Sequence, residues 1–408
     1  SLPEAIAKHA PDVVGLPSMT FTILDVIETV RCVRAAAPMA TIVIGGTHAT
    51  LFPVETLTVT GADIIVVGEG EETFSDLLRT LSRKETLTDC PGLVFRANGG
   101  IVKTGTRPGP DIEKLPFPAR KLCPVARYSS PIARRSPVTT MFTSRGCPCR
   151  CTYCDRPALG KNARFVSATR VVQEFRECSD LGIREIFIYD DTFTLNRKRA
   201  FDICRMLQDE SLPITWDVRT RVDTVDRHLL LELKNAGCER IHFGVESGSE
   251  RVLKVYKKNI SRRQIIDAFS HCHDLGITTF AYFMIGAPGE TRQEFDGTKQ
   301  LLREINPSYV QIGILCPFPG TEVFHDGAQR GLFAKDVWAQ FAQEPRPDFA
   351  LPYWEENMSR SEMFELALET YRAFYGRPRF LLAELMRLRS FAEFKRKAKA
   401  GIKLLLWN

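Results

Sequence analysis

Short apolar runs alternate with helix-like stretches along the N-terminal part of the chain. Three runs rich in Val and Ile occupy residues 12–18, 41–48 and 63–70, and each leads into Gly or Ser. The stretches 22–37 and 50–60 between them have helical spacing. Near-continuous apolar strands that alternate with helices are typical of a parallel sheet covered on both faces. In such sheets, ligands bind beyond the carboxyl ends of the strands.

A second alternation of strands and helices begins near residue 138. We predict six strands, at residues 138–144, 185–191, 215–221, 240–247, 279–286 and 309–317. Helices are expected between and after them, at residues 168–181, 197–209, 226–236, 249–256, 261–275 and 291–304. Strand–helix units in an unbroken row predict a parallel barrel, complete or partial. Residues 359–408 carry a helical pattern.

These patterns predict an α/β chain in four parts. A parallel α/β domain occupies residues 1–82, and a linker with a small hairpin occupies residues 83–137. The turn of that hairpin is expected at Asn98-Gly99-Gly100. The barrel occupies residues 138–330, and a C-terminal helical region occupies residues 331–408.

Composition and charge exclude several classes of protein. The hydrophobic share of 44% and the charged share of 25% are those of an ordinary globular protein, and no apolar run approaches the roughly 20 residues that span a bilayer. Twelve cysteines among 408 residues argue against a disulfide framework and favour a reducing, cytoplasmic location. Residues 377–408 hold nine Lys or Arg against two Glu, so the net charge of +6 belongs to the tail. The rest of the chain is close to neutral, and we expect no nucleic-acid partner.

Four cysteines lie within eight residues, on the loop that follows the first barrel strand. Cys147, Cys151 and Cys154 have the spacing C-x3-C-x2-C, whereas Cys149 would add a C-x-C pair that is sterically poor for one cluster. Three thiolates can hold a 4Fe–4S cluster and leave one iron open to a small molecule. Structural cysteines or a zinc site are the alternatives. Zinc commonly takes four ligands from two C-x2-C pairs, and the sequence has no second pair here.

The cysteine spacing, with Tyr153 before the last cysteine, resembles the radical S-adenosylmethionine superfamily. Further motifs of that family follow at successive strand ends: IYDDTF, GVESGSE, FMIGAPGET and CPFPGTEVF. The resemblance implies that Cys147, Cys151 and Cys154 hold the cluster. The usual Gly-Gly-Glu of the first of these motifs is replaced, so either of two aspartates is a candidate for the methionine amino group. The implied S-adenosylmethionine site comprises Tyr153, Asp190, Asp191, Glu246, Ser247, Gly286, Pro288 and Glu290.

The N-terminal part resembles the cobalamin-binding domain of one subgroup of these enzymes. GGTHAT at 45–50 and GEGEET at 68–73 carry this resemblance, which covers almost the whole chain. It is closest to the broad group of the anaerobic magnesium-protoporphyrin monomethyl ester cyclase and the radical carbon methylases. A flavodoxin-like domain is implied, and its first strand is expected to be missing because the chain opens on Ser1 inside a helical pattern. The implied cobalamin contacts are Ser18, Thr20, Gly45, Gly46, His48, Gly68, Glu69 and Gly70.

The sequence leaves three interpretations of His48 open. The motif D-x-H-x-x-G, which supplies a histidine to cobalt in some cobalamin proteins, is absent from the sequence. His48 is a candidate cobalt ligand, a contact to the nucleotide tail of the cofactor, or a loop histidine satisfied within the protein. A dinucleotide site is disfavoured, because no G-x-G-x-x-G follows a strand and opens a helix.

The resemblance implies an enzyme with a 4Fe–4S cluster, S-adenosylmethionine and cobalamin. A 5′-deoxyadenosyl radical then abstracts hydrogen from an unactivated carbon of a small molecule, with electrons from a flavodoxin or ferredoxin. Methyl transfer to that carbon is our preferred outcome, and oxidative cyclisation of a porphyrin-type substrate is the alternative. A radical methylthiotransferase is a further enzymatic rival. A non-catalytic cobalamin or iron–sulfur sensor or carrier is the rival from another class.

The basic tail allows two interpretations. Apolar residues recur at helical spacing through residues 377–408, the polar face is basic, and Trp407 closes the segment. Such helices can lie on an anionic membrane surface, here the inner surface of the membrane, where a lipophilic substrate would be available. The other interpretation is a helical cap on the barrel with a solvated basic face.

Overall fold

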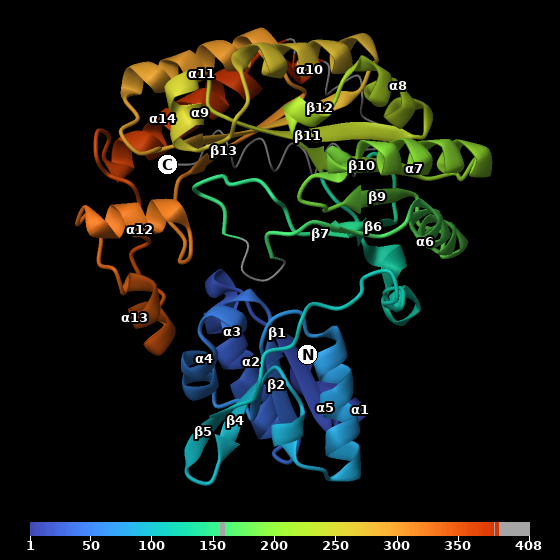
Figure 1. The fold of residues 1–408 in the computed structure, drawn as a ribbon, viewed down its shortest axis with the longest axis vertical. Helices are drawn as coiled ribbons and strands as arrows, with labels where there is room; N and C mark the ends of the chain where they lie inside the picture. Colours follow the sequence, from blue (N-terminus) through green and yellow to red (C-terminus); the bar gives the residue numbers. More distant parts are fainter. Residues whose placement is uncertain (156–159, 379, 383–408) are drawn as a thin grey trace. The chain divides into compact units, whose positions relative to one another are not determined.

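The computed structural model describes residues 1–155, 160–378 and 380–382 (Figure 1). The chain forms two compact units, and each is assembled from segments that are distant in the sequence. The first unit contains residues 1–115, residues 318–352 and a short segment around residue 160. The second contains residues 116–154, residues 162–317 and the described residues from 353 on. Each unit has its own sheet.

A five-stranded sheet forms the centre of the first unit, in the order β1-β2-β3-β4-β5. The apolar runs form its parallel strands, β1 (Val13–Pro17), β2 (Thr41–Gly45) and β3 (Ile64–Val66). Figure 1 shows α5 on one side of the sheet and α2 and α4 on the other. The helices of this part are α1 (Leu2–His9), α2 (Ile23–Ala36), α3 (Thr47–Leu51), α4 (Pro53–Thr60) and α5 (Glu71–Arg83).

The hairpin predicted inside a linker belongs to this sheet. Strands β4 (Leu93–Ala97) and β5 (Gly100–Lys103) are joined by Asn98 and Gly99, whose φ values of 52° and 77° match the predicted turn. β4 also pairs antiparallel with β3. The hairpin joins the first unit because β4 carries apolar side chains that are buried in its core, Leu93 and Phe95 among them.

A segment from late in the sequence completes the first unit. It contains α12 (Glu322–Gln329) and α13 (Val337–Gln343), and α13 contacts α4. Trp338 is buried and stacks on Phe318 with ring centroids 5.3 Å apart. The hydrophobic pattern predicts these residues at the end of the barrel and in a C-terminal helical region, because such a pattern does not show which sheet a helix packs against.

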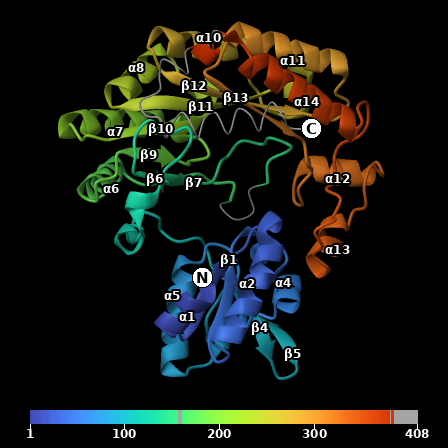
Figure 2. The ribbon, with the colours of Figure 1, turned by 180° about the vertical axis from the view of Figure 1, so that it is seen from behind.

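Six parallel strands form an open half-barrel in the second unit, in the spatial order β13-β12-β11-β10-β9-β6. They are β6 (Val138–Met141), β9 (Glu185–Ile188), β10 (Thr215–Thr220), β11 (Cys238–Glu246), β12 (Thr278–Ile285) and β13 (Tyr309–Ile314). The six predicted strands are all present, and the barrel is partial. Figures 1 and 2 show helices along the outer face of this sheet. The helices of the unit are α6 (Ala168–Asp180), α7 (Arg197–Glu210), α8 (Arg227–Asn235), α9 (Glu250–Val255), α10 (Arg262–Asp274), α11 (Arg292–Ile305) and α14 (Arg360–Tyr375).

Polar caps fix where the helices of the half-barrel begin. A side chain before each of α6 to α11 accepts a hydrogen bond from a backbone N–H of the first turn. These caps are short polar residues that can be recognised in the sequence. The predicted helix starts therefore agree closely with the observed ones. The capping residues are Ser167, Asn196, Asp226, Ser249, Ser261 and Thr291.

Side chains cover both edges of the half-barrel. Along β13, the Tyr371 hydroxyl accepts from Ile312 N at 2.6 Å and donates to Ile312 O at 3.0 Å. The Tyr375 hydroxyl does the same with Val310, at 3.0 and 2.7 Å. Arg120 donates to a backbone carbonyl of β6 at 3.0 Å. Unpaired strand edges invite pairing with other chains, so these side chains take the place of the strands that would close a full barrel.

In the described portion of the C-terminal part, residues Arg360–Tyr375 form the helix α14. Residues 383–408, which hold most of the predicted basic helix, lie outside the described residues. Of the helices that the structure describes, none combines the length and the apolar character needed to cross a membrane.

Candidate functional site

The cysteine loop leaves the half-barrel after its first strand. A short antiparallel pair, β7 (Ser144–Arg145) and β8 (Arg164–Phe165), brackets it. Thr152 fixes its middle, because Thr152 N donates to Tyr256 O at 3.0 Å and the Thr152 hydroxyl donates to Val255 O at 3.2 Å. The loop is therefore held to the end of α9, the helix that follows strand β11.

The four thiols of this loop are more exposed than the four buried cysteines of the half-barrel unit. Cys147, Cys149 and Cys151 are half-buried and Cys154 is exposed. The Cys149 thiol hydrogen-bonds to Cys147 and lowers the pKa of Cys147 to about 6, while the same contact raises the pKa of Cys149. Among the described side chains, no three His, Cys, Asp or Glu are arranged as a preformed metal site. The buried cysteines of the unit, whose thiol pKa values burial raises, are Cys178, Cys204, Cys238 and Cys272.

The two aspartates after β9 have different surroundings. Asp190 is 1% exposed and accepts from Thr143 N at 2.6 Å, from the Thr143 hydroxyl at 2.5 Å and from Ser144 N at 3.0 Å. Burial raises the pKa of Asp190. Asp191 is exposed, and its charge acts on the Cys147 thiol. Asp190 therefore holds the chain that enters the cysteine loop, and Asp191 is the carboxylate beside a cysteine.

A buried ion pair occupies the carboxyl end of β11. Lys258 Nζ lies 2.7 Å from Glu246 Oε1 and 3.3 Å from the Tyr153 hydroxyl. Glu246 adopts a φ of 69°, a conformation that is uncommon outside glycine and that clusters at functional sites. Gly244 makes room for the pair, because a Cβ there would lie 2.5 Å from Glu246 Oε1. Burial and the Glu246 charge raise the pKa of Tyr153, so its hydroxyl stays protonated.

The buried Glu290 side chain binds the backbone of the turn after β12. The side chain is 2% exposed, and Oε2 accepts from Gly286 N at 2.7 Å and from Ala287 N at 3.0 Å. Burial raises the pKa of Glu290 to about 7. Ser247 is also fully buried, and Pro288 is half-buried. Glu290 therefore fixes the backbone of the turn after β12, at a strand end where cofactor contacts are predicted.

Two basic residues that the sequence motifs do not single out reach the cysteine loop. Arg221, directly after β10, places Nη1 4.0 Å from Cys151 Sγ. Lys258 contacts Tyr153 of the same loop, as described above. The position of Arg221 at a strand end was a usable signal, because the other predicted residues also lie at strand ends. Lys258 had no such signal, since it lies twelve residues beyond Glu246 and helix α9 separates the two.

Exposed aromatic side chains directly follow two strands of the half-barrel, β6 and β9. Tyr189 and Asp191 both follow β9, which ends at Ile188. Tyr189 and Phe142 are 43% and 53% exposed, with ring centroids 6.3 Å apart. The Arg219 guanidinium lies 3.6 Å from the centroid of the Tyr189 ring and 2.8 Å from Asp217. These exposed rings were not predicted, because hydrophobic periodicity does not tell which aromatic residues after a strand stay exposed to solvent.

In the first unit, the ends of β1 and β2 bring four predicted residues together. Ser18 N and the Ser18 hydroxyl both donate to Gly45 O, at 2.7 and 2.8 Å, and the hydroxyl accepts from Ala49 N at 3.2 Å. The Thr20 hydroxyl lies 3.1 Å from His48 Nδ1. His48 is fully buried, and burial lowers its pKa to about 4, so the ring is neutral. Its Nε2 has no hydrogen-bond partner among the described residues.

The glycines of this region serve different purposes. Gly46 has a φ of 99°, and a Cβ there would lie 2.4 Å from Ser18 O, so the fold itself requires this glycine. Gly68 has a φ of 81° with no atom within 4 Å of its Cβ position, so its surroundings are open. Glu69 and Gly70 are half-buried between β3 and α5. Two exposed apolar residues beside Ser18 were not predicted to be functional, Met19 and Phe21, which are 49% and 79% exposed.

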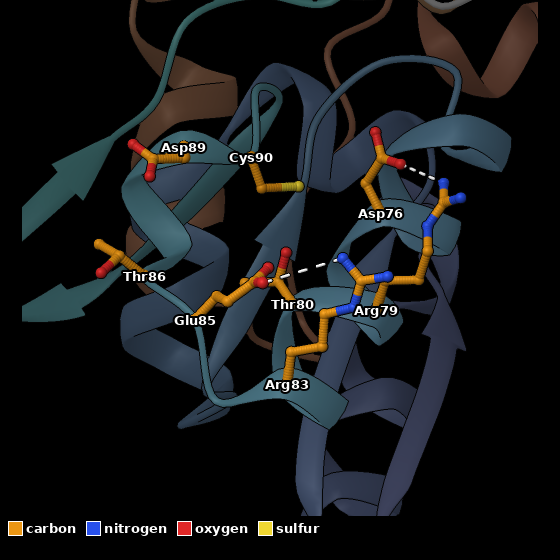
Figure 3. Close-up of a pocket in the computed structure, with 8 residues that line it drawn as sticks. All are labelled: Asp76, Arg79, Thr80, Arg83, Glu85, Thr86, Asp89 and Cys90. Carbon is orange, nitrogen blue, oxygen red and sulfur yellow. Dashed lines mark hydrogen bonds and ion pairs between the residues drawn. The ribbon is translucent and has the colours of Figure 1, made fainter.

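A separate polar pocket of about 640 Å³ lies at α5 and the turn after it. Figure 3 shows its charged side chains directed at one another, with Arg79 beside Asp76 and Arg83 3.8 Å from Glu85. The pocket contains none of the residues that the motifs single out. Four of its charged side chains pair with one another, Arg79 with Asp76 and Arg83 with Glu85, so it is not a candidate for the chemistry described here.

Comparison with known proteins connects both strand-end regions to families. The sequence profile of the Radical SAM superfamily matches residues 141–302, and that of the B12 binding domain matches residues 1–78. An uncharacterized methyltransferase of Pyrococcus horikoshii is 31% identical over 95% of this chain and 84% of its own. The anaerobic magnesium-protoporphyrin IX monomethyl ester cyclase of Cereibacter sphaeroides is 26% identical over 92% of this chain and 61% of its own.

A solved structure shares the fold across nearly the whole chain. The cobalamin-dependent S-adenosylmethionine radical enzyme OxsB, with aqua-cobalamin bound, superposes with a TM-score of 0.73 at 18% identity. The match covers 96% of this chain and 63% of OxsB. This similarity confirms the predicted fold class, an α/β domain followed by a partial radical S-adenosylmethionine barrel.

The residues present fit the cofactors of these families. Three solvent-accessible thiols on one loop, with Arg221 beside them, are a suitable donor set for an iron–sulfur cluster. In the first unit, the open surroundings of Gly68 and the exposed apolar side chains of Met19 and Phe21 suit a large flat cofactor. The two profiles and the relative that spans 95% of the chain agree: this chain belongs to the cobalamin-binding radical S-adenosylmethionine enzymes, whose cofactors are a 4Fe–4S cluster, S-adenosylmethionine and cobalamin.

Proposed function

We propose that this enzyme methylates an unactivated carbon of a small molecule. The observation that carries the proposal is the presence, on one chain, of both family domains together with similarity, over 95% of the chain, to a relative named as an uncharacterized methyltransferase. When bound, the three cofactors supply the radical and the methyl group. The protein binds and orients them and keeps water away from the reacting atoms.

In this proposal, Cys147, Cys151 and Cys154 hold the cluster and Cys149 does not. Asp191 receives the amino group of S-adenosylmethionine, because it is exposed and its charge acts on Cys147, whereas Asp190 is buried and holds the backbone of Thr143 and Ser144. An exposed carboxylate keeps its charge and can accept from an ammonium group.

The remaining predicted residues contribute in two ways. Glu246 and Tyr153 form the wall beside the cluster, and Lys258 holds their polar atoms in place. A second set acts through the backbone, because buried or turn-forming side chains fix the strand ends that approach the cofactor. That set consists of Ser247, Gly286, Pro288 and Glu290.

The proposed cobalamin site lies at the carboxyl ends of β1, β2 and β3. A neutral, buried His48 bonded to Thr20 suits a contact near the nucleotide tail better than cobalt ligation, because a cobalt ligand needs an accessible ring nitrogen. Exposed Met19 and Phe21 would add apolar contact to the ring system. The predicted contacts are Ser18, Thr20, Gly45, Gly46, His48, Gly68, Glu69 and Gly70.

The substrate is a small molecule, and an electron donor must reduce the cluster. We propose a lipophilic substrate, because Phe142 and Tyr189 present exposed rings directly after strands β6 and β9 of the half-barrel. A flavodoxin or ferredoxin is the proposed donor. Residence at the inner surface of the membrane through residues 383–408 would bring the enzyme to such a substrate.

Oxidative cyclisation is a second candidate function. It is favoured by the similarity to the magnesium-protoporphyrin IX monomethyl ester cyclase, which extends over 92% of this chain. Mass analysis separates the two reactions after anaerobic reconstitution with iron, sulfide and cobalamin and addition of S-adenosylmethionine and reductant. Methylation adds one methylene unit to the substrate, whereas cyclisation removes hydrogen.

Cysteine variants test the cluster assignment. Alanine at Cys147, Cys151 or Cys154 should each abolish cleavage of S-adenosylmethionine, because two thiolates do not hold the cluster with its open iron. Cys149→Ala is the matched control and should keep both iron and cleavage. Iron content, visible absorption and release of 5′-deoxyadenosine provide the measurement. Full iron content and full cleavage in any of the first three variants would show that the ligand set is wrong.

A further inference from the structure

Arg221 is held against the cysteine loop by three separate contacts. Nη1 lies 4.0 Å from Cys151 Sγ, Nη2 donates to Lys258 O at 2.5 Å, and the guanidinium also binds Asp223. Its side chain is only 10% exposed, and that of Asp223 is 23% exposed. The positive charge is therefore fixed next to a proposed cluster ligand and is weakly screened by water.

Asp223 offsets this charge from the far side. Its carboxylate oxygens lie 2.8 and 2.9 Å from Arg221 Nε and Nη2, whereas Nη1 is the nitrogen directed at Cys151. The pair thus forms a dipole with its positive end toward the sulfur. A second arginine, Arg219 within β10, has its own partner in Asp217 at 2.8 Å.

Hydrogen bonds to cluster sulfurs and the local net charge are among the factors that set the reduction potential of an iron–sulfur cluster. We propose that Arg221 is a positioning residue that raises the reduction potential of the cluster, and that Asp223 limits the rise. The physical reason is that reduction adds one negative charge to the cluster, and a nearby positive charge stabilises the reduced state more than the oxidised state. This inference rests on the proposed cluster at Cys147, Cys151 and Cys154.

A redox titration of the reconstituted full chain, without S-adenosylmethionine, tests this role. The reduced fraction is followed by electron paramagnetic resonance at controlled potentials. In Arg221→Gln, we expect the ratio of reduced to oxidised cluster at a fixed potential to fall tenfold, which corresponds to a shift of about 59 mV to lower potential. Asp223→Asn should shift the potential in the opposite direction. Arg219→Gln should shift it less than Arg221→Gln, because the guanidinium of Arg219 pairs with Asp217 and lies over Tyr189, whereas Arg221 points at Cys151.

Opposite shifts separate an electrostatic role from a merely structural one. Loosening of the loop would change the potential in the same direction in both variants, and that result would overturn the proposal. Equal potentials in wild type, Arg221→Gln and Arg221→Lys would overturn it as well. If Arg221→Gln does not assemble a cluster, Arg221→Lys and Asp223→Asn carry the test, with the charge-retaining Lys variant expected close to wild type. A wild-type chain that takes up no cluster would instead contradict the proposed function itself.

Discussion

Glu246 shows how one residue of the half-barrel depends on several neighbours. Its backbone is in the left-handed region at a φ of 69°, and the pairing register between β11 and β12 shifts between Gly244 and Glu246. The carboxylate then meets Lys258 at 2.7 Å inside the space that Gly244 leaves empty. A conformation with this cost persists only where the surroundings determine it, so the ion pair and the glycine belong together.

Gly244→Ala should displace the Glu246–Lys258 pair without changing either partner. The added Cβ would lie 2.5 Å from Glu246 Oε1 and 2.8 Å from Lys258 Nζ. We expect S-adenosylmethionine to bind roughly tenfold more weakly to the reconstituted protein, a loss of about 1.4 kcal/mol. Equilibrium dialysis measures this affinity. Gly297→Ala on α11, where no atom lies within 4 Å of the Cβ position, is the control. Unchanged affinity in Gly244→Ala would remove Glu246 from the proposed site.

His48 makes the stability of the first unit depend on pH. Burial lowers its pKa from 6.5 to about 4 in the folded state. Below pH 6.5 the unfolded chain therefore binds a proton that the folded chain does not, and stability falls as the pH falls toward 4. Between pH 7.5 and pH 5, this one group should cost about 2 kcal/mol of unfolding free energy.

His48→Asn should reduce that acid sensitivity, because asparagine can still bond to Thr20 and has no titrating group. Urea unfolding of the cobalamin-free protein at the two pH values measures the difference. His9→Asn, on the exposed surface of α1, should leave the wild-type loss in place. The same loss of stability in His48→Asn as in wild type would show that His48 is not the responsible group.

At the scale of elements, α14 replaces a missing strand. The sheet stops at β13, and two tyrosine hydroxyls of α14 pair with both the N–H and the C=O of Ile312 and Val310. Burial raises the pKa of Tyr371, so its hydroxyl remains able to donate. A helix therefore satisfies an edge that would otherwise pair with another chain.

Tyr371→Phe should destabilise the half-barrel by about 1–3 kcal/mol, because it leaves the N–H and the C=O of Ile312 without their partner in a half-buried position. The expected readout is a lower urea midpoint with an unchanged slope. Tyr128→Phe, at a residue that is 43% exposed, is the control and should change the midpoint little. A Tyr371→Phe midpoint equal to that of wild type would mean that water replaces the hydroxyl without cost.

At the scale of the whole molecule, the charge is distributed unevenly. Residues 383–408 hold seven Lys or Arg against two Glu and close with Trp407. Each basic residue near an anionic membrane surface contributes roughly 1 kcal/mol of attraction. Together with apolar residues at helical spacing, this segment could hold the enzyme at such a surface.

Sedimentation with anionic vesicles tests the membrane interpretation. The full chain should sediment with vesicles rich in phosphatidylserine, and added salt should release it. A chain ending at Leu382, the last described residue, should stay in the supernatant while keeping its iron and cobalamin. Neutral phosphatidylcholine vesicles provide the lipid control. Equal recovery of the full chain in the supernatant with and without anionic lipid would support the helical cap instead.

The sequence determined the local features of this protein. Six strands and the helices between them followed from periodicity, and the caps before α6 to α11 fixed their starts, because both signals depend on neighbours a few residues away. The spacing of Cys147, Cys151 and Cys154 indicated the family, which the profiles and the relative that spans 95% of the chain confirm. The roles of those cysteines remain predictions until the variants are measured.

The tertiary structure decided what depends on residues far apart in the sequence. It joined the 93–103 hairpin and residues 318–352 to the first unit, and it left the barrel half open. It distinguished Asp190 from Asp191 by burial, although the two are adjacent in the sequence. It also brought Arg221 and Lys258 to the cysteine loop. Hydrogen bonding and desolvation depend on distance in space, and periodicity along a single chain carries no information about that distance for residues on different elements.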